Sequence, residues 1–141
     1  MGGLSHSTVT YSKGEEFLFA GEISPTNGGG FCSIRSPNLD LDVSEFCSIG
    51  IEVQGDGKRY ALRLFSYSQF DTYAYEVRWQ TSSSDWGQFT FPLNELAPKW
   101  RGREVTNAPP LNKAHITSIG FLIADKQFGT FSLRVRRVWF E

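Results

Sequence analysis

Trp100 is followed closely by two arginines, Arg101 and Arg103, and this is the residue pattern in the chain best suited to binding. An exposed indole fills a pocket on a partner, and a guanidinium pairs with a carboxylate through two hydrogen bonds. Pro109 and Pro110 stiffen the same stretch further along. These five are our candidate partner-binding residues. In the structural alternative, which stays open, Trp100 covers one end of the core and the arginines pair with nearby acids.

The segment that carries these residues, 92–112, has no strand or helix periodicity beyond a single turn near 93–96. Loops longer than about 12–15 residues are uncommon in compact domains and are frequently functional. The sequence therefore predicts one long irregular loop that forms a binding surface.

Catalytic chemistry finds little support in the chain. The two histidines, His6 and His115, lie far apart, and the Gly-x-Ser-x-Gly nucleophile motif is absent. Three consecutive glycines at 28–30 lack the Lys-Ser/Thr pair of a phosphate-binding loop, so they indicate a turn. We expect no enzymatic activity, no catalytic residues and no cofactor.

Asp40 and Asp42 alternate with apolar residues, which places both carboxylates on one face of an extended segment. With added backbone carbonyls, such a pair can hold calcium. It equally fits an exposed strand edge kept soluble by charge. No zinc pattern of cysteines and histidines is present. We expect no metal site, and calcium at the two aspartates stays an open alternative.

An alternative ligand surface comes from polar and aromatic residues of neighbouring segments, because sugar sites combine rings with a few polar groups. Its candidate residues are Arg63, Tyr67, Glu76 and Arg78.

Other aromatic residues nearby, Tyr73, Tyr75 and Trp79, alternate with the polar residues and share a face with Val77. Strand alternation therefore predicts that these three rings belong to the core. Whether they are buried separates a sugar-binding face from an ordinary core.

The elements that position all these residues are predicted to be strands. Asp-Gly at 56–57, between two alternating segments, predicts a hairpin. No amphipathic segment of helix length occurs, so we predict an all-β fold, an antiparallel jelly-roll β-sandwich in a single domain over residues 1–141. Nine segments have strand patterns bounded by turn residues: 9–11, 17–23, 31–36, 49–53, 60–64, 73–79, 89–91, 116–123 and 131–140.

Composition agrees with one globular domain. The chain has 141 residues, 40% of them hydrophobic and 15% aromatic, which suffices for a sandwich core. The net charge of −1 argues against nucleic acid as a partner. Arg134, Arg136 and Arg137 of the last segment are expected on an exposed sheet face.

Cys32 and Cys47 are predicted to be free and buried. If their segments formed a hairpin centred near Leu41, Cys32 would lie opposite Gly50 and not opposite Cys47, so a disulfide is not favoured.

No signal-peptide pattern and no apolar run of membrane-spanning length occur. We therefore expect no direct membrane insertion and an intracellular location, cytoplasmic or organellar.

Several separated segments match the pattern of one known family, in the family's order along nearly the whole chain. They are 1–5 (MGGLS), 27–36 (NGGGFCSIRS), 55–60 (GDGKRY) followed by 62–64 (LRL), 101–103 (RGR), 108–111 (APPL), 119–123 (IGFLI) and 129–133 (GTFSL). Through these segments the chain resembles the complex I intermediate-associated protein family.

The resemblance implies a galactose-binding-like β-sandwich and a non-enzymatic role, because mitochondrial members help to assemble respiratory complex I. It offers no catalytic residues to carry over. Two hypotheses follow. The first is a protein-interaction module, an assembly factor or chaperone-like domain whose partners are protein subunits of a membrane complex. The alternative is a carbohydrate-binding module with a sugar ligand.

Overall fold

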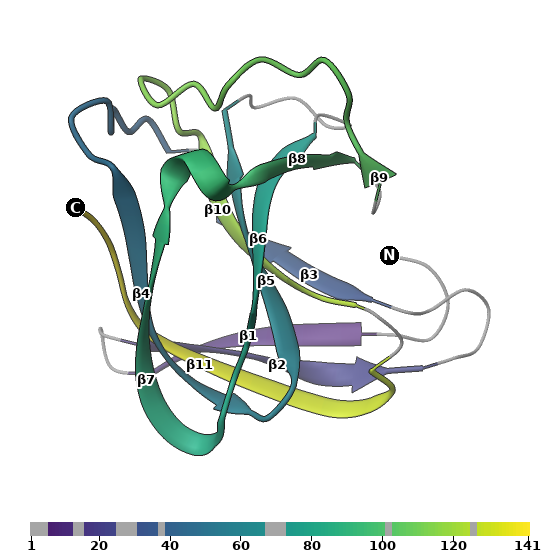
Figure 1. The fold of residues 1–141 in the computed structure, drawn as a ribbon. Coiled ribbons are helices and arrows are strands. Elements are labelled where there is room, and N and C mark those ends of the chain that lie inside the picture. Colours follow the sequence, from purple (N-terminus) through teal and green to yellow (C-terminus); the bar gives the residue numbers. More distant parts are fainter. Residues whose placement is uncertain are drawn as a thin grey trace.

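The computed structural model describes residues 6–12, 16–24, 31–36, 39–66, 73–100, 103–124 and 127–141, with the side chains of all but residues 6–12 and 84. Figure 1 shows two antiparallel sheets, here called sheet A and sheet B. Sheet A has the strand order β1-β2-β11-β4-β7, and sheet B has the order β3-β10-β5-β6-β8-β9. Within the described ranges, no helix is long and apolar enough to cross a membrane.

The strands of sheet A are β1 (His6–Ser12), β2 (Glu16–Ile23), β4 (Ser48–Asp56), β7 (Ser83–Pro92) and β11 (Gly129–Phe140). The strands of sheet B are β3 (Cys32–Arg35), β5 (Arg59–Phe65), β6 (Ala74–Gln80), β8 (Ala97–Trp100), β9 (Arg103–Glu104) and β10 (Ser118–Ile123).

The fold is an antiparallel jelly-roll β-sandwich, as predicted, and each of the nine predicted segments forms a strand. The long loop is less irregular than expected. After the predicted single turn, η2 (Leu93–Glu95), strands β8 and β9 extend sheet B. Pro98 lacks an N–H donor, but β8 is short and lies near the sheet edge, where this is tolerated.

The hairpin predicted at Asp56-Gly57 is wrong, because β4 and β5 belong to different sheets. Gly57 adopts a positive φ of 88°, and the turn carries the chain from sheet A to sheet B. The Asp56 carboxylate fixes this turn. It accepts hydrogen bonds from the Lys58 N–H (3.1 Å), the Tyr60 hydroxyl (3.0 Å) and the Ser132 N–H of β11 (2.9 Å). Alternation alone does not distinguish strands that pair from strands that face each other across a core.

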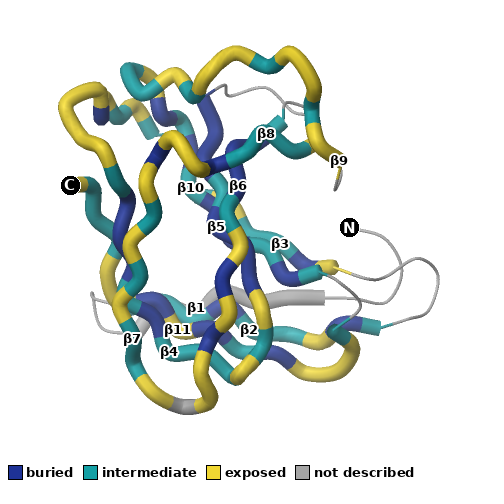
Figure 2. The backbone as a smooth tube through the Cα atoms, viewed as in Figure 1, coloured by how far each residue is buried: buried dark blue, intermediate teal, exposed yellow. Residues whose placement is uncertain are grey.

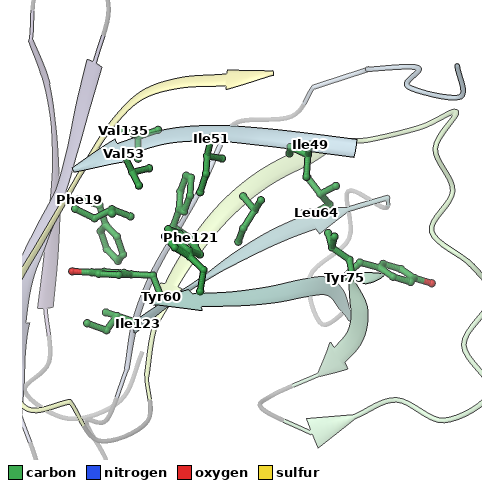
Figure 3. Close-up of a cluster of buried hydrophobic side chains, with 14 of the residues drawn as sticks. Phe19, Ile49, Ile51, Val53, Tyr60, Leu64, Tyr75, Phe121, Ile123 and Val135 are labelled. Atoms are coloured by element: carbon green, nitrogen blue, oxygen red, sulfur yellow. The ribbon is translucent and has the colours of Figure 1, made fainter. Parts of the chain in front are cut away.

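The core lies between the two sheets (Figure 3). Ile51 and Val53 of sheet A meet Tyr60, Leu64 and Phe121 of sheet B, and none of the five is more than 2% exposed. Each buried side chain of this size stabilises the fold by about 1.5–3 kcal/mol. The residues that alternate with these core residues point outward, so each sheet has its own outer face.

Burial raises the pKa of the Tyr60 hydroxyl, and the nearby Asp56 carboxylate adds to this increase. Because the folded state has the higher pKa, the stability that neutral Tyr60 contributes is present below the unfolded pKa and is lost as pH rises above it. We expect the free energy of unfolding to fall by about 1.4 kcal/mol per pH unit above about pH 10. Urea unfolding at alkaline pH should show this slope in the wild type and not in Tyr60→Phe. Equal slopes in both proteins would contradict the assignment.

Both cysteines are free, as predicted, but only Cys32 is buried, whereas Cys47 is exposed. The hairpin considered for these segments does not form, since β3 belongs to sheet B and β4 to sheet A. Cys47 precedes β4 at one end of the sandwich, where its N–H donates to the Glu141 carbonyl at 2.8 Å.

Candidate functional site

Trp100 ends β8 and Arg103 begins β9, and the two residues are cross-strand partners. Both are exposed, with 40% of the Trp100 surface accessible. By strand alternation, Trp100 projects from the same side of β8 as Pro98. Arg101 lies outside the described residues.

The segment after β9 is exposed, but its backbone is attached to the sandwich (Figure 2). The Val105 N–H donates to the Pro98 carbonyl at 3.1 Å, and the Tyr75 hydroxyl donates to the Pro109 carbonyl. Figure 3 shows this hydroxyl pointing away from the other labelled core side chains. Pro109 and Pro110 therefore lie on a surface whose backbone is fixed before any partner arrives, which lowers the entropic cost of binding.

A pocket of about 550 Å³ lies between the η2 segment and this anchored segment. Its volume falls in the range of small-ligand and side-chain sites. The side chains that line it include Tyr75, Leu93, Leu96, Pro98, Pro109 and Leu111. We call this pocket, together with Trp100, Arg103, Pro109 and Pro110, the loop surface.

Three residues of the alternative ligand face, Arg63, Glu76 and Arg78, lie together on the outer face of sheet B. Arg63 and Glu76 are cross-strand partners, with the Arg63 Nε 3.6 Å from the Glu76 Oε1. The Arg78 Nε donates to the Glu76 Oε2 at 3.1 Å. The Glu76 side chain is only 3% exposed, so two guanidiniums compensate one buried carboxylate. Tyr67, the fourth candidate, lies outside the described residues.

Two further residues of this face, Arg35 and Gly120, were not among the candidates. The register places Arg35, Gly120, Arg63 and Glu76 in one row across β3, β10, β5 and β6. The Arg35 guanidinium lies 3.9 Å from the Phe65 ring centroid, and that of Arg63 lies 5.3 Å from it. A single glycine inside an apolar strand was the available signal, since it marks a close approach. The strand order that joins it to the arginines is not visible in the sequence.

The rings next to this row belong to the core, as predicted. Tyr75 and Trp79 are 4% and 6% exposed, and Tyr73 packs against Tyr75 at 5.7 Å between ring centroids. These rings therefore offer no stacking platform on the outer face of sheet B.

The arginines of β11 lie on the outer face of sheet A, as expected, and they have partners there. The Arg136 Nε donates to the Glu52 Oε1 at 3.0 Å, and its guanidinium lies 4.1 Å from the Trp86 ring centroid. Arg134 pairs with Glu16 at 3.0 Å. This face is a network of ion pairs and stacked rings, not a concentrated basic patch.

The remaining polar candidates show ordinary surface contacts. The Asp42 carboxylate accepts hydrogen bonds from the N–H and hydroxyl of Ser44. Asp40 lies 4.0 Å from His115, and the two side chains are 92% and 66% exposed, unlike a water-excluded catalytic pair. No group of three or more His, Cys, Asp or Glu residues gathers within the described part of the chain. The side chain of His6 lies outside that part.

A family model described as complex I intermediate-associated protein 30 (CIA30) matches residues 1–135. The match covers every strand of sheet B and ends within β11 of sheet A.

Solved structures with a similar fold include carbohydrate-binding modules and parts of agarases. A family 11 carbohydrate-binding module from Clostridium thermocellum, in complex with a β-1,3-1,4-mixed-linked tetrasaccharide, has a TM-score of 0.61 at 15% identity, over 93% of this chain and 81% of that chain. A family 30 module has a TM-score of 0.60 at 12% identity, over 97% and 83%. The agarase AgWH50C has a TM-score of 0.63 at 9% identity, over 98% of this chain but only 22% of the agarase. At these identities the likeness shows the fold alone.

Proposed function

Because this chain belongs to the complex I intermediate-associated protein 30 family, we propose that it is a non-enzymatic protein-interaction module that assists the assembly of complex I. The match over residues 1–135 carries this proposal. The absence of a catalytic arrangement among the described residues is consistent with it, since Asp40 and His115 form only an exposed contact.

We place the contact with a complex I subunit on the loop surface. Trp100 is exposed next to a preformed pocket with an apolar lining, and aromatic anchors next to such pockets dominate many protein interfaces. Arg103 supplies a charge for a partner carboxylate. Tyr75 holds the loop backbone at Pro109, so the partner meets a rigid surface.

The test is a tagged pull-down from mildly solubilised source cells, read by mass spectrometry. We expect complex I subunits to be enriched with the wild type and reduced at least about tenfold with Trp100→Ala, because an anchor aromatic contributes that much or more. Phe128→Ala is the matched control, since Phe128 is similarly exposed, at 45%, but follows Gln127, which bonds to Arg59 at the opposite end of β5. Equal recovery with Trp100→Ala and the wild type would exclude the loop surface, and no enrichment of complex I subunits would exclude the assembly role.

Carbohydrate binding is the second candidate function. It is supported by the polar group of Arg63, Glu76 and Arg78 on one sheet face of a fold that carbohydrate-binding modules share. The burial of Tyr75 and Trp79 weighs against it. Calorimetric titration with the mixed-linked tetrasaccharide tests it, because a sugar site on this face requires binding that Arg78→Ala abolishes.

A further inference from the structure

On the outer face of sheet B, the described strands carry five cations and two acids, although the whole chain has a net charge of −1. The acids on its strands are Glu76 and Glu104, and Glu104 already pairs with Lys99 at 3.6 Å. Around the centre of the sheet, three guanidiniums therefore accompany one carboxylate of the described strands. The cations that register and alternation place on this face are Arg35, Arg59, Arg63, Arg78 and Lys99.

Two of these guanidiniums converge over the Phe65 ring. Arg35 and Arg63 stand two strands apart, about 10 Å between Cα atoms, with Gly120 between them. Both guanidiniums approach the same Phe65 ring. Gly120 contributes no side chain, and a Cβ atom there would lie 2.6 Å from the Ile34 carbonyl oxygen. Gly120 therefore lets the β3 backbone and the Phe65 ring pack closely over this position, which places that ring beneath the two guanidiniums.

Arg63 also carries a hydrogen-bond donor that lacks an acceptor. Its Nε is buried and has no hydrogen-bond partner in the described part of the chain, since the Glu76 oxygen lies 3.6 Å away. Burial lowers the pKa of the Arg63 guanidinium; Glu76 opposes this effect, and Arg35 and Arg78 add to it. The hydroxyl of Ser118, which lies beside Phe65 on the same face and is 0% exposed, likewise has no partner within the described residues. Buried polar groups without a protein partner require an explanation such as an ordered water, an ion or a ligand oxygen.

We propose that the outer face of sheet B binds a carboxylate of an acidic peptide segment between Arg35 and Arg63. The two Nη atoms of an arginine also form a fork that matches the two oxygens of a carboxylate, so Arg63 can bind it through these atoms while its Nε faces Glu76. Arg35 approaches from the other side of Gly120 and adds its charge.

An acidic peptide fits this face better than an acidic sugar. Sugars gain much of their affinity by stacking on open aromatic rings, but Phe65 is only 5% exposed beneath Arg35. Tyr75 and Trp79 face the core. The described surface therefore offers charge and hydrogen-bond donors, which suit Asp or Glu side chains along an extended chain.

Isothermal titration of the whole chain with an oligoglutamate peptide tests the proposal, with an oligoglutamine peptide of equal length as the neutral probe. We expect only oligoglutamate to bind, and Arg63→Gln to weaken it about tenfold, as for the loss of a charge-assisted pair. Arg35→Gln should weaken binding similarly, and because Arg35 is exposed this variant decides the matter if Arg63→Gln does not fold. Glu76→Gln should strengthen binding, because it removes the carboxylate that competes for Arg63.

Arg134→Gln is the matched control, since Arg134 is an exposed, ion-paired arginine on sheet A. It should leave the affinity unchanged, and equal weakening by Arg134→Gln and Arg63→Gln would overturn the site in favour of general charge attraction. Binding of trigalacturonic acid without binding of oligoglutamate would overturn the peptide as ligand. Trp100→Ala should not affect oligoglutamate binding, because Trp100 and the Arg63 row lie on opposite sides of sheet B. A lack of oligoglutamate binding would therefore contradict the peptide site without contradicting the proposed role of the loop surface.

Discussion

Trp79→Ala is expected to lower the free energy of unfolding by about 3–5 kcal/mol, the cost of removing a large aromatic side chain from a packed core. The Trp79 ring is 6% exposed and joins the two sheets. Its centroid lies 6.1 Å from those of Tyr60 and Phe121 in sheet B, and 6.3 Å and 6.1 Å from those of Phe89 and Phe91 in sheet A. Truncation therefore opens a cavity where the sheets meet. Urea denaturation followed by far-ultraviolet circular dichroism measures the loss without relying on tryptophan fluorescence.

The matched control for this variant is Trp86→Ala. Trp86 lies on the outer face of sheet A under the guanidinium of Arg136, so its removal leaves a solvent-filled space and costs about 1 kcal/mol. Similar losses for the two tryptophans would contradict the assignment of Trp79 to the centre of the core.

The position of Trp79 was predictable because alternation alone fixes which face of a strand a side chain occupies. The pattern of residues 73–79 placed Tyr75 and Trp79 on the core side, and it thereby placed Glu76 and Arg78 on the outer side. Arg63 was expected outside for the same reason, and the three polar residues are indeed neighbours. Local periodicity was therefore enough to place Arg63, Glu76 and Arg78 on the outer face of sheet B.

Strand order was not predictable, because it depends on packing between segments that are distant in sequence. The Asp-Gly turn at 56–57 carries a hairpin signal, yet it joins the two sheets. The Asp56 carboxylate of this turn accepts a hydrogen bond from the Ser132 N–H of β11, and no local sequence pattern predicts this contact. For the same reason the sequence could not predict that Arg35 and Gly120 are neighbours, since β3 pairs with β10 and not with β4.

The long loop is a third case, because the local sequence predicted an irregular segment and the structure has the strands β8 and β9 there. Pro98 and the polar residues of 97–104 have weak strand propensity, but β6 offers an unpaired edge to which β8 adds. This pairing gives β8 two different sides. Pro98 lines the pocket of the loop surface, whereas Ala97 continues the row of Arg63 and Glu76. The two proposed contacts, with a partner at the loop surface and with an acidic peptide on the outer face of sheet B, therefore use opposite sides of one strand and would not block each other.

Gly120 is the residue of the Arg63 row that tolerates a side chain least. A Cβ atom at this position would meet the Ile34 carbonyl oxygen at 2.6 Å, closer than real Cβ contacts, and the Phe65 ring at 3.4 Å. The oxygen belongs to the backbone of β3, so a rotamer change does not relieve the contact. Because β3 is an edge strand of only four residues, it is the element that must move.

Gly120→Ala is therefore expected to destabilise the protein by about 2 kcal/mol, as for an overpacked core site, despite the higher strand propensity of alanine. Amide hydrogen exchange should locate the damage, with faster exchange in β3 and unchanged protection in β4 and β11. Gly87→Ala in edge strand β7 is the matched control, since its nearest contact is the flexible Phe89 side chain at 3.1 Å, and its stability should change by less than about 0.5 kcal/mol. Because β3 carries Arg35, Gly120→Ala should also weaken oligoglutamate binding. If Gly120→Ala kept the wild-type free energy of unfolding and the wild-type amide exchange in β3, the close approach of the β3 backbone to Gly120 would be contradicted.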